Sequence, residues 1–346
     1  MPIEHETRDG ALVWIRNPIT GVVSYVVDVR NKSFAFTLGL RDEPVEPPHL
    51  TDAQIHAATK DCPFCPGNEH LSTAELFRMS AAEIPEWTGK GNRPHDQWVV
   101  RVFNNLFPRI PAELTAGRNE SYIVVEDPRH YVDSPRSHSD LLSTAMLGAG
   151  HFRRLLEADV RVMRLARENH SIRAVVVRKN QGRESGASQP HPHQQIIGSP
   201  EPFPAVAAEA RAERETPGLF DEIATLMERL GLVIENQGGV VSYASPIGSF
   251  PRSYDVMMPE YRDATLADLS SDELDCFAGA LYRILRILGP LPLDYEIHQG
   301  PGLPLHAHVN ARFYPYSNVA GTLNLPSTLL QRTAEIRTAI ARGNRR

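Results

Sequence analysis

Two histidines separated by one residue stand in the segment 188–198, which also carries a glutamine and ends in apolar residues. On a β-strand, His191, His193 and Gln195 would all lie on one face, because side chains alternate along a strand. A neutral imidazole is a good nucleophile toward phosphorus near neutral pH. His193 is therefore a candidate nucleophile that would carry a nucleotidyl group, but the spacing fits a metal-chelating histidine pair equally well.

Polar residues around this pair could handle a phosphate. Gln195 could hydrogen-bond the non-bridging oxygens of the transferred group, as stabilisation of the transition state requires. Asn180 and Ser188 could do the same from the two ends of a loop rich in glycine and small polar residues. A flexible polar loop that leads into a histidine strand suits a phosphate placed against a nucleophile.

A CxxC pair, Cys62 and Cys65, could chelate one zinc ion from a single turn. A closed tetrahedral site needs two more ligands, and the chain has no second CxxC, so histidines must supply them. His130 and His191 are candidates, although spacing does not exclude the other histidines. The alternative is a reduced surface turn without a metal.

A second HxH pair, His306 and His308, has no glutamine nearby, and this copy is expected to be degenerate for catalysis. Together with Glu209 and His298 it could form a second metal site with oxygen and nitrogen ligands. The alternative is a polar strand at an interface.

The elements expected to position these residues occur in the same order twice. Each copy contains two strands, a helix, a strand and the strand with the HxH pair, in about residues 98–198 and again in about 232–315. A capping box, Ser270 to Glu273, opens the helix of the second copy. The helix of the first copy is expected over 139–168, and residues 73–94 are expected to be irregular.

Composition limits the class of protein. The 346 residues carry a net charge of −6 with a pI of about 6.2, which argues against a nucleic-acid-binding surface. The chain contains no run of 18 apolar residues and begins with a polar segment, so neither a membrane span nor a signal peptide is expected. Three cysteines with one tight pair favour a reducing cytoplasm and a metal site over disulfides.

Four motifs together resemble the galactose-1-phosphate uridylyltransferases, which belong with the ADP-glucose phosphorylases to the histidine-triad superfamily. The motifs are Cys62-Pro63-Phe64-Cys65-Pro66-Gly67-Asn68, Val102-Phe103-Asn104-Asn105-Leu106-Phe107-Pro108, Asn180-Gln181-Gly182 and the stretch from Ser188 to Gln195. The resemblance covers about residues 15–315. It implies an α+β fold of two fused histidine-triad-like halves, with helices packed on antiparallel sheets.

The expected organisation has five parts. They are an N-terminal extension with the zinc knuckle at 1–97, a first half with the HPHxQ motif at 98–204, a helical connection at 205–231, a second, degenerate half at 232–330 and a C-terminal tail at 331–346.

The resemblance also assigns roles to residues. It makes His193 the nucleophile and Gln195 its partner at the nucleotidyl phosphate, with phosphate contacts from Ser188 and Asn180. It places nucleotide contacts at Asn105 and at an N-terminal arginine, Arg30. The zinc ligands it implies are Cys62, Cys65, His130 and His191, and the ligands of a second site for iron or zinc are Glu209, His298, His306 and His308.

The activity implied is a ping-pong nucleotidyl transfer between a nucleotide sugar and a sugar 1-phosphate or phosphate, in a homodimer. Two departures concern the substrate: Leu106 stands where the family has an aspartate, and residues 317–324 lack the glutamate of a Gly-Phe-Glu signature. Galactose and uridine are therefore not implied. The alternatives are a phosphorylase or hydrolase of the same superfamily and a nucleotide-binding protein without turnover.

Overall fold

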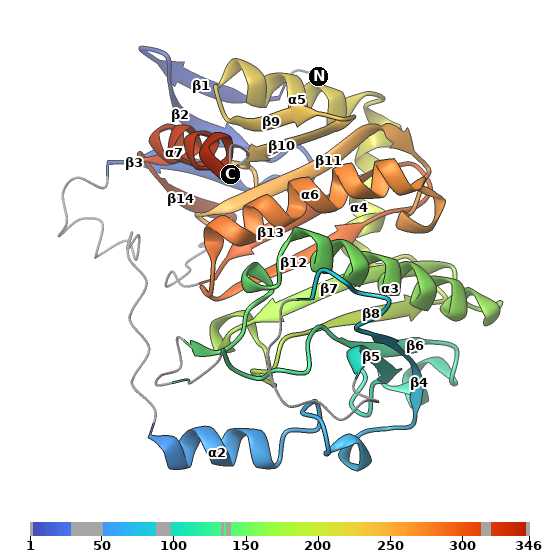
Figure 1. Ribbon diagram of the computed structural model, residues 1–346. Coiled ribbons are helices and arrows are strands. Elements are labelled where there is room, and N and C mark those ends of the chain that lie inside the picture. The colour runs from blue at the N-terminus through green and yellow to red at the C-terminus, as the bar shows by residue number, and fades with distance from the viewer. Residues whose placement is uncertain are drawn as a thin grey trace. The chain divides into compact units, whose positions relative to one another are not determined.

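The computed structural model describes residues 3–28, 51–87, 98–132, 135, 140–312 and 320–343 (Figure 1). Arg30 lies outside the described residues. The chain forms two compact units, which are described separately. One comprises Val45–Pro202 with Leu288–Pro292, and the other comprises Met1–Pro44, Phe203–Ile287 and Leu293–Arg346. The five-part organisation expected from the sequence stays a prediction.

The unit with the HPHxQ motif is built on five antiparallel strands. In chain order they are β4 (Glu75–Ser80), β5 (Trp98–Asn104), β6 (Glu120–Val125), β7 (Ala174–Gln181) and β8 (His193–Ser199). In space the order is β4-β5-β6-β8-β7. The short helix α2 (Asp52–Lys60) precedes the CxxC turn.

Helix α3 (Ala149–Glu168) covers this sheet with the apolar face expected from its sequence. Phe152, Leu155 and Met163 on that face are fully buried. The helix begins ten residues later than expected, because Gly148 takes a φ of 94° at its N-terminus and a 3₁₀ turn (Thr144–Met146) precedes it. A positive φ is readily adopted only by glycine and is incompatible with continuing a helix.

Strand β4 corrects the expectation that residues 73–94 are irregular. It pairs with β5 on one side only, so it is an edge strand. Of its six side chains, only Met79 is buried. An edge strand with charged, solvent-facing residues lacks the apolar alternation by which strands are recognised in a sequence.

The other unit repeats this arrangement. Its strands are β9 (Val233–Gln237), β10 (Val240–Ala244), β11 (Ser253–Arg262), β12 (Leu293–His298) and β13 (Pro304–Ala311). Their order in space is β9-β10-β11-β13-β12, again antiparallel. Helix α6 (Ser271–Leu288) takes the place of α3 in the chain order, and the expected capping box is formed by Ser270 and Glu273.

The two sheets therefore share one topology, in which the last of the five strands in chain order, β8 or β13, lies between the third and the fourth. This confirms the predicted duplication and the α+β fold of two similar halves. In the second unit, helices α4 (Pro204–Glu215) and α5 (Leu219–Arg229) precede the repeat.

A smaller sheet completes the second unit. It contains β1 (His5–Arg8), β2 (Ala11–Arg16), β3 (Val23–Val27) and β14 (Thr322–Pro326), and β14 runs parallel to β3. Helix α7 (Leu329–Gly343) packs against β9 and β10. Within the described part of the chain, no helix has the length and apolar character needed to cross a membrane.

Candidate active site and metal centres

The CxxC turn and two distant histidines meet in a buried cluster. The Sγ of Cys65 lies 3.5 Å from the Nδ1 atoms of both His130 and His191, and the Sγ of Cys62 lies 3.7 Å from the Nδ1 of His191. All four donor atoms lie within 4.8 Å of one another. The Asn68 side chain holds the turn by donating to the carbonyl of Cys62 at 2.9 Å. The structure thus brings together all four residues that the resemblance assigned to zinc.

The donor set fits a tetrahedral zinc ion. The Nε2–H of His191 donates to the carbonyl of Asp127 at 2.7 Å, which leaves the lone pair of Nδ1 facing the thiols. A hydrogen bond from the Cys65 thiol lowers the pKa of Cys62 to about 2. The same hydrogen bond, burial and the negative charge of Cys62 raise the pKa of Cys65, because two adjacent thiolates repel each other. Burial lowers the pKa of His130, which keeps it neutral, as a ligand must be. A divalent cation would allow both thiols to ionise.

The neighbouring histidine has the geometry of a nucleophile. The Nδ1–H of His193 donates to the carbonyl of His191 at 2.8 Å, so Nε2 carries the free lone pair. Burial lowers the pKa of His193 to about 4, which keeps the ring neutral. The strand expected to hold both histidines begins only at His193, so His191 lies just before β8. The ring of His191 therefore faces the thiols, whereas the Nε2 of His193 is not part of that cluster, although only one residue separates the two histidines.

The residues expected to contact phosphate are placed less uniformly. Gln195 is half-buried in β8, between Ile123 of β6 and Arg178 of β7. Asn180 donates its amide to the carbonyl of Ser185 and so shapes the loop that follows β7. Ser188 is exposed.

Asn105 also forms hydrogen bonds within its own part of the chain. Its Oδ1 accepts from the backbone of Phe107 at 3.0 Å, and its amide donates to Ser121 at 3.2 Å. The phosphate and nucleotide roles of these residues stay predictions.

Sequence reasoning missed a buried ion pair next to the candidate nucleophile, His193. The ammonium of Lys179 lies 2.5 Å from Glu126 and donates to the carbonyl of His193 at 3.3 Å. Both side chains are at most 1% exposed. Glu126 also accepts from the hydroxyl of Thr144 at 2.6 Å. The only signal in the sequence was a lysine following a run of valines, and nothing local identified its partner.

Replacing Lys179 with methionine is expected to destabilise the protein by about 3–5 kcal/mol, because it leaves the Glu126 carboxylate buried without its cation. Adding Glu126→Gln should restore much of this loss, since no uncompensated charge then remains. Urea unfolding of the two single variants and the double variant measures this coupling. Losses that simply add in the double variant would show that the pair does not act as described.

A second buried carboxyl should make stability depend on pH. Both oxygens of Asp159 on α3 lack a hydrogen-bond partner among the described residues, and burial, with Glu126 nearby, raises its pKa well above the ordinary 3.8. When folding raises the pKa of an acid, the folded state binds the proton more tightly than the unfolded state, so ionisation of the acid destabilises the folded state. Its contribution to stability therefore falls as the pH rises from the unfolded pKa through the folded one.

We expect Asp159→Asn to gain stability relative to wild type as the pH increases from 4 to 7. The free energy of unfolding in urea, measured for both proteins at several pH values, gives the difference directly. A difference that stays flat or shrinks with pH would contradict this assignment.

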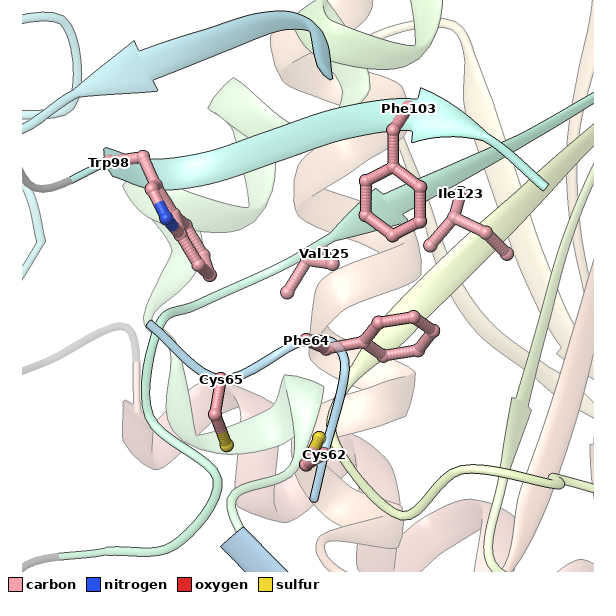
Figure 2. Close-up of a cluster of buried hydrophobic side chains, with 7 residues drawn as sticks. All are labelled: Cys62, Phe64, Cys65, Trp98, Phe103, Ile123 and Val125. Atoms are coloured by element: carbon pink, nitrogen blue, oxygen red, sulfur yellow. The ribbon is translucent and has the colours of Figure 1, made fainter. Parts of the chain in front are cut away.

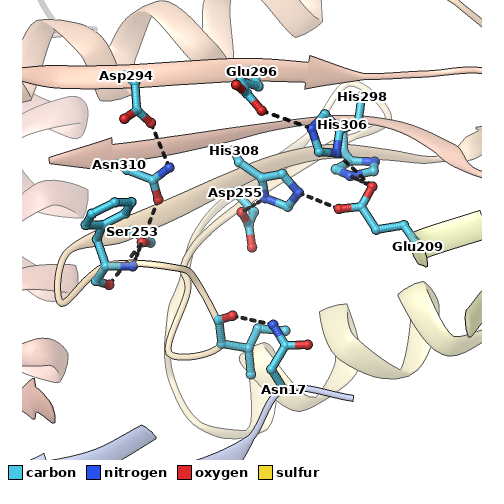
Figure 3. Close-up of polar contacts among 12 residues, drawn as sticks. Asn17, Glu209, Ser253, Asp255, Asp294, Glu296, His298, His306, His308 and Asn310 are labelled. Atoms are coloured by element: carbon cyan, nitrogen blue, oxygen red, sulfur yellow. Dashed lines mark hydrogen bonds and ion pairs between the residues drawn. The ribbon is translucent and has the colours of Figure 1, made fainter. Parts of the chain in front are cut away.

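The second unit holds a cluster of three histidines around a carboxylate (Figure 3). Glu209 on α4 lies 2.7 Å from the Nδ1 of His298, 3.1 Å from the Nε2 of His308 and 3.4 Å from the Nε2 of His306. The four donor atoms lie within 4.8 Å of one another. The structure therefore brings together the residues expected to form the second metal site.

The carboxylates of this cluster attract positive charge. Burial opposes protonation of His308, but Asp255, 2.6 Å from its Nδ1, and Glu209 outweigh this effect and raise its pKa well above the ordinary value. A metal ion bound here would take the place of that proton. His306 donates Nδ1–H to the carbonyl of Pro304 at 2.8 Å, two residues back, as His193 does to His191. A cavity of about 200 Å³ adjoins the cluster. One carboxylate and three imidazoles suit iron or zinc.

The fold and the site place the chain among α+β proteins with two histidine-triad-like halves. No family model matches the sequence. The chain is 25% identical to ADP-glucose phosphorylase of Arabidopsis thaliana over 288 residues, which cover 79% of this chain and 77% of that protein.

Solved structures of three proteins share this fold. A crystal structure of an ADP-glucose phosphorylase from Arabidopsis thaliana with bound ADP-glucose matches with a TM-score of 0.64 and 19% identity, over 97% of this chain and 98% of that one. A GalT-like protein from Arabidopsis thaliana matches with a TM-score of 0.63 and 20% identity, over 94% and 97%. A uridylyltransferase matches with a TM-score of 0.61 and 22% identity, over 94% and 98%. The resemblance to the galactose-1-phosphate uridylyltransferase-like proteins is thereby confirmed.

Proposed function

We propose that this protein is a nucleotidyltransferase that acts on a nucleotide sugar through a covalent nucleotidyl group on His193. The observation that carries the proposal is the hydrogen bond from the Nδ1–H of His193 to the carbonyl of His191, which leaves Nε2 as a free nucleophile. The similarity to an ADP-glucose phosphorylase supports the same class of reaction.

In the first step, the Nε2 lone pair of His193 attacks the α-phosphorus of the nucleotide sugar. The bond from phosphorus to the bridging oxygen breaks, and the sugar phosphate leaves with the bonding electrons. In the second step, an oxygen of the acceptor attacks the same phosphorus, and the electrons of the N–P bond return to Nε2. Gln195, two residues along β8, would hydrogen-bond the oxygens on which charge develops.

The remaining predicted contacts complete the proposal. Asn180 and Ser188 would bind phosphate oxygens, and Asn105 and Arg30 would bind the nucleotide. Asn180 holds its loop through the amide nitrogen, so its oxygen would be the group that meets phosphate. Asn105 uses both ends of its amide within its own loop, so it would contribute mainly by shaping that loop.

Metal ions bound at the two clusters would have a structural role. Zinc would be held by Cys62, Cys65, His130 and His191, where it would fix the turn and the segment that leads into β8. Glu209, His298, His306 and His308 would hold iron or zinc in the second unit. Bound zinc supplies a rigid tetrahedral link between chain segments.

Inorganic phosphate is the acceptor that the similarity to a phosphorylase favours over a sugar 1-phosphate. The enzyme would work in the cytoplasm, as its free cysteines suggest, and as a homodimer, which only the family resemblance supports.

A donor screen tests the proposal. The protein is incubated with UDP-, ADP- and GDP-sugars, alone and with phosphate or a sugar 1-phosphate, and the products are separated. We expect one donor to yield a nucleoside diphosphate with phosphate, or a new nucleotide sugar with a sugar 1-phosphate. Release of a nucleoside monophosphate at a rate that neither acceptor changes would indicate a hydrolase instead, and no product from any donor would contradict the proposal.

A further inference from the structure

The aromatic residue between the two cysteines contacts the candidate nucleophile. The ring of Phe64 lies 4.9 Å from the ring of His193, with an angle of 61° between their planes. It lies farther, 6.2 Å, from the ring of His191. Figure 2 shows Phe64 on the same turn as Cys62 and Cys65, within a buried apolar cluster. One turn thus supplies both thiols of the metal cluster and a ring against His193.

The ring of Phe64 also packs against a second aromatic ring. The ring of Phe103 on β5 lies 5.7 Å from that of Phe64, and the guanidinium of Arg101 lies 4.5 Å from the centre of the Phe103 ring. Arg101 is 1% exposed and donates to the hydroxyl of Ser72 at 2.6 Å and to the carbonyl of Pro63 at 3.4 Å. A buried cation therefore holds both the turn and the aromatic pair, so Phe64 has little freedom to move away from His193.

We propose that Phe64 positions the imidazole of His193 and stabilises the positive charge that this ring acquires when it carries the nucleotidyl group. The inference rests on the proposed function. When Nε2 forms a bond to phosphorus and Nδ1 keeps its proton, the imidazole ring becomes cationic, and the charge is lost again when the N–P bond breaks. The tilted pairing of the two rings at 4.9 Å brings the edge of one ring against the face of the other. An aromatic ring attracts a cation that lies over its electron-rich face within about 6 Å.

The effect is specific to the reaction because the Nδ1–H of His193 is bonded to the His191 carbonyl and Nε2 reacts through its lone pair, so the reacting ring gains its positive charge as the bond to phosphorus forms. The contact with Phe64 then strengthens as charge develops, and an interaction that is stronger in the transition state than in the ground state increases the rate. Other charges near His193 act in the opposite sense: the Lys179 ammonium, which binds the His193 carbonyl, disfavours a second cation. The carbonyl of His191, the negative charge of Cys62 and the ring of Phe64 act in favour of it.

The test measures how fast a labelled nucleotide donor transfers its nucleotidyl group to the protein in a single turnover. Phe64→Leu keeps an apolar side chain but removes the ring, and labelling should slow by about tenfold, the range expected for a partly desolvated cation–π contact. The matched control is Phe103→Leu, which removes a buried ring from the same cluster that does not contact His193. It should slow labelling by less than about threefold, since only the support of Phe64 is lost.

A graded series separates charge from shape and covers the case in which Phe64→Leu does not fold. Phenylalanines with increasing numbers of fluorine atoms at position 64 weaken the electron-rich face while nearly keeping the shape of the ring. Labelling should slow with each step at position 64 and stay constant in the same series at 103. A constant rate across the position 64 series, or wild-type labelling by Phe64→Leu, would overturn the inference. Wild type that takes up no label would instead overturn the proposed function.

Discussion

Replacing His193 with alanine is expected to abolish nucleotidyl transfer, with kcat lowered by about 10⁴-fold or more, the scale seen when a nucleophile is removed. Without Nε2 no N–P bond can form at this position, and the neighbouring imidazole of His191 is already engaged elsewhere. The His191 side chain is directed at the thiols of Cys62 and Cys65, with its other nitrogen bonded to the carbonyl of Asp127. Substrate affinity should change little, because the other predicted phosphate and nucleotide contacts remain.

Steady-state kinetics with the donor identified in the screen measures the effect. His170→Ala is the matched control, since His170 is an exposed histidine that belongs to neither cluster. It should behave as wild type. If His193→Ala kept more than about a tenth of the wild-type kcat, covalent catalysis at this residue would be refuted.

Removing one thiol of the cluster should unfold much of the HPHxQ unit. We expect Cys65→Ala to lose bound zinc and to lower the free energy of unfolding by about 5 kcal/mol or more, because the binding energy of a structural zinc ion contributes directly to folding. The Sγ of Cys65 lies 3.5 Å from both histidine nitrogens of the cluster, so its loss leaves three ligands and an open position. Activity should fall with it, because the turn also carries Phe64.

Zinc content of the purified protein and urea unfolding with and without a chelator provide the measurement. Cys276→Ala is the control, since this half-buried thiol on α6 belongs to neither cluster. Its zinc content should be unchanged. Wild-type protein without zinc, or a Cys65→Ala variant that retains zinc and stability, would contradict the structural role assigned to the cluster.

Much of the fold could be predicted because its signals are local. Alternating strands, the capping box at Ser270 and the apolar face of α3 depend on nearby residues, so the repeat of two strands, helix, strand and HxH strand was visible in the sequence. Strand β4 was missed because an exposed edge strand with charged residues has no such pattern. The start of α3 was predicted too early, because the boundary is set by the backbone conformation of Gly148 and the pattern of polar and apolar residues does not change there.

The site was predicted where a motif carries the chemistry. The CxxC and HxH spacings identified two cysteines and four histidines. His130, His298 and Glu209 were candidates among other residues, and the resemblance singled them out. The pair Lys179 and Glu126 and the contact between Phe64 and His193 were missed. Each joins residues far apart in the chain, 53 residues in the first case, and such contacts exist only once the strands are paired.

Mass spectrometry of the quenched reaction can show whether His193 carries the nucleotidyl group. The protein is mixed with a nucleotide sugar, denatured within the first turnover, digested and mapped. We expect about one nucleotidyl group per chain on the peptide that contains His193, and we expect it to be lost when phosphate or a sugar 1-phosphate is added before quenching. Turnover with no modified peptide, or a modification that maps to another residue, would contradict this expectation.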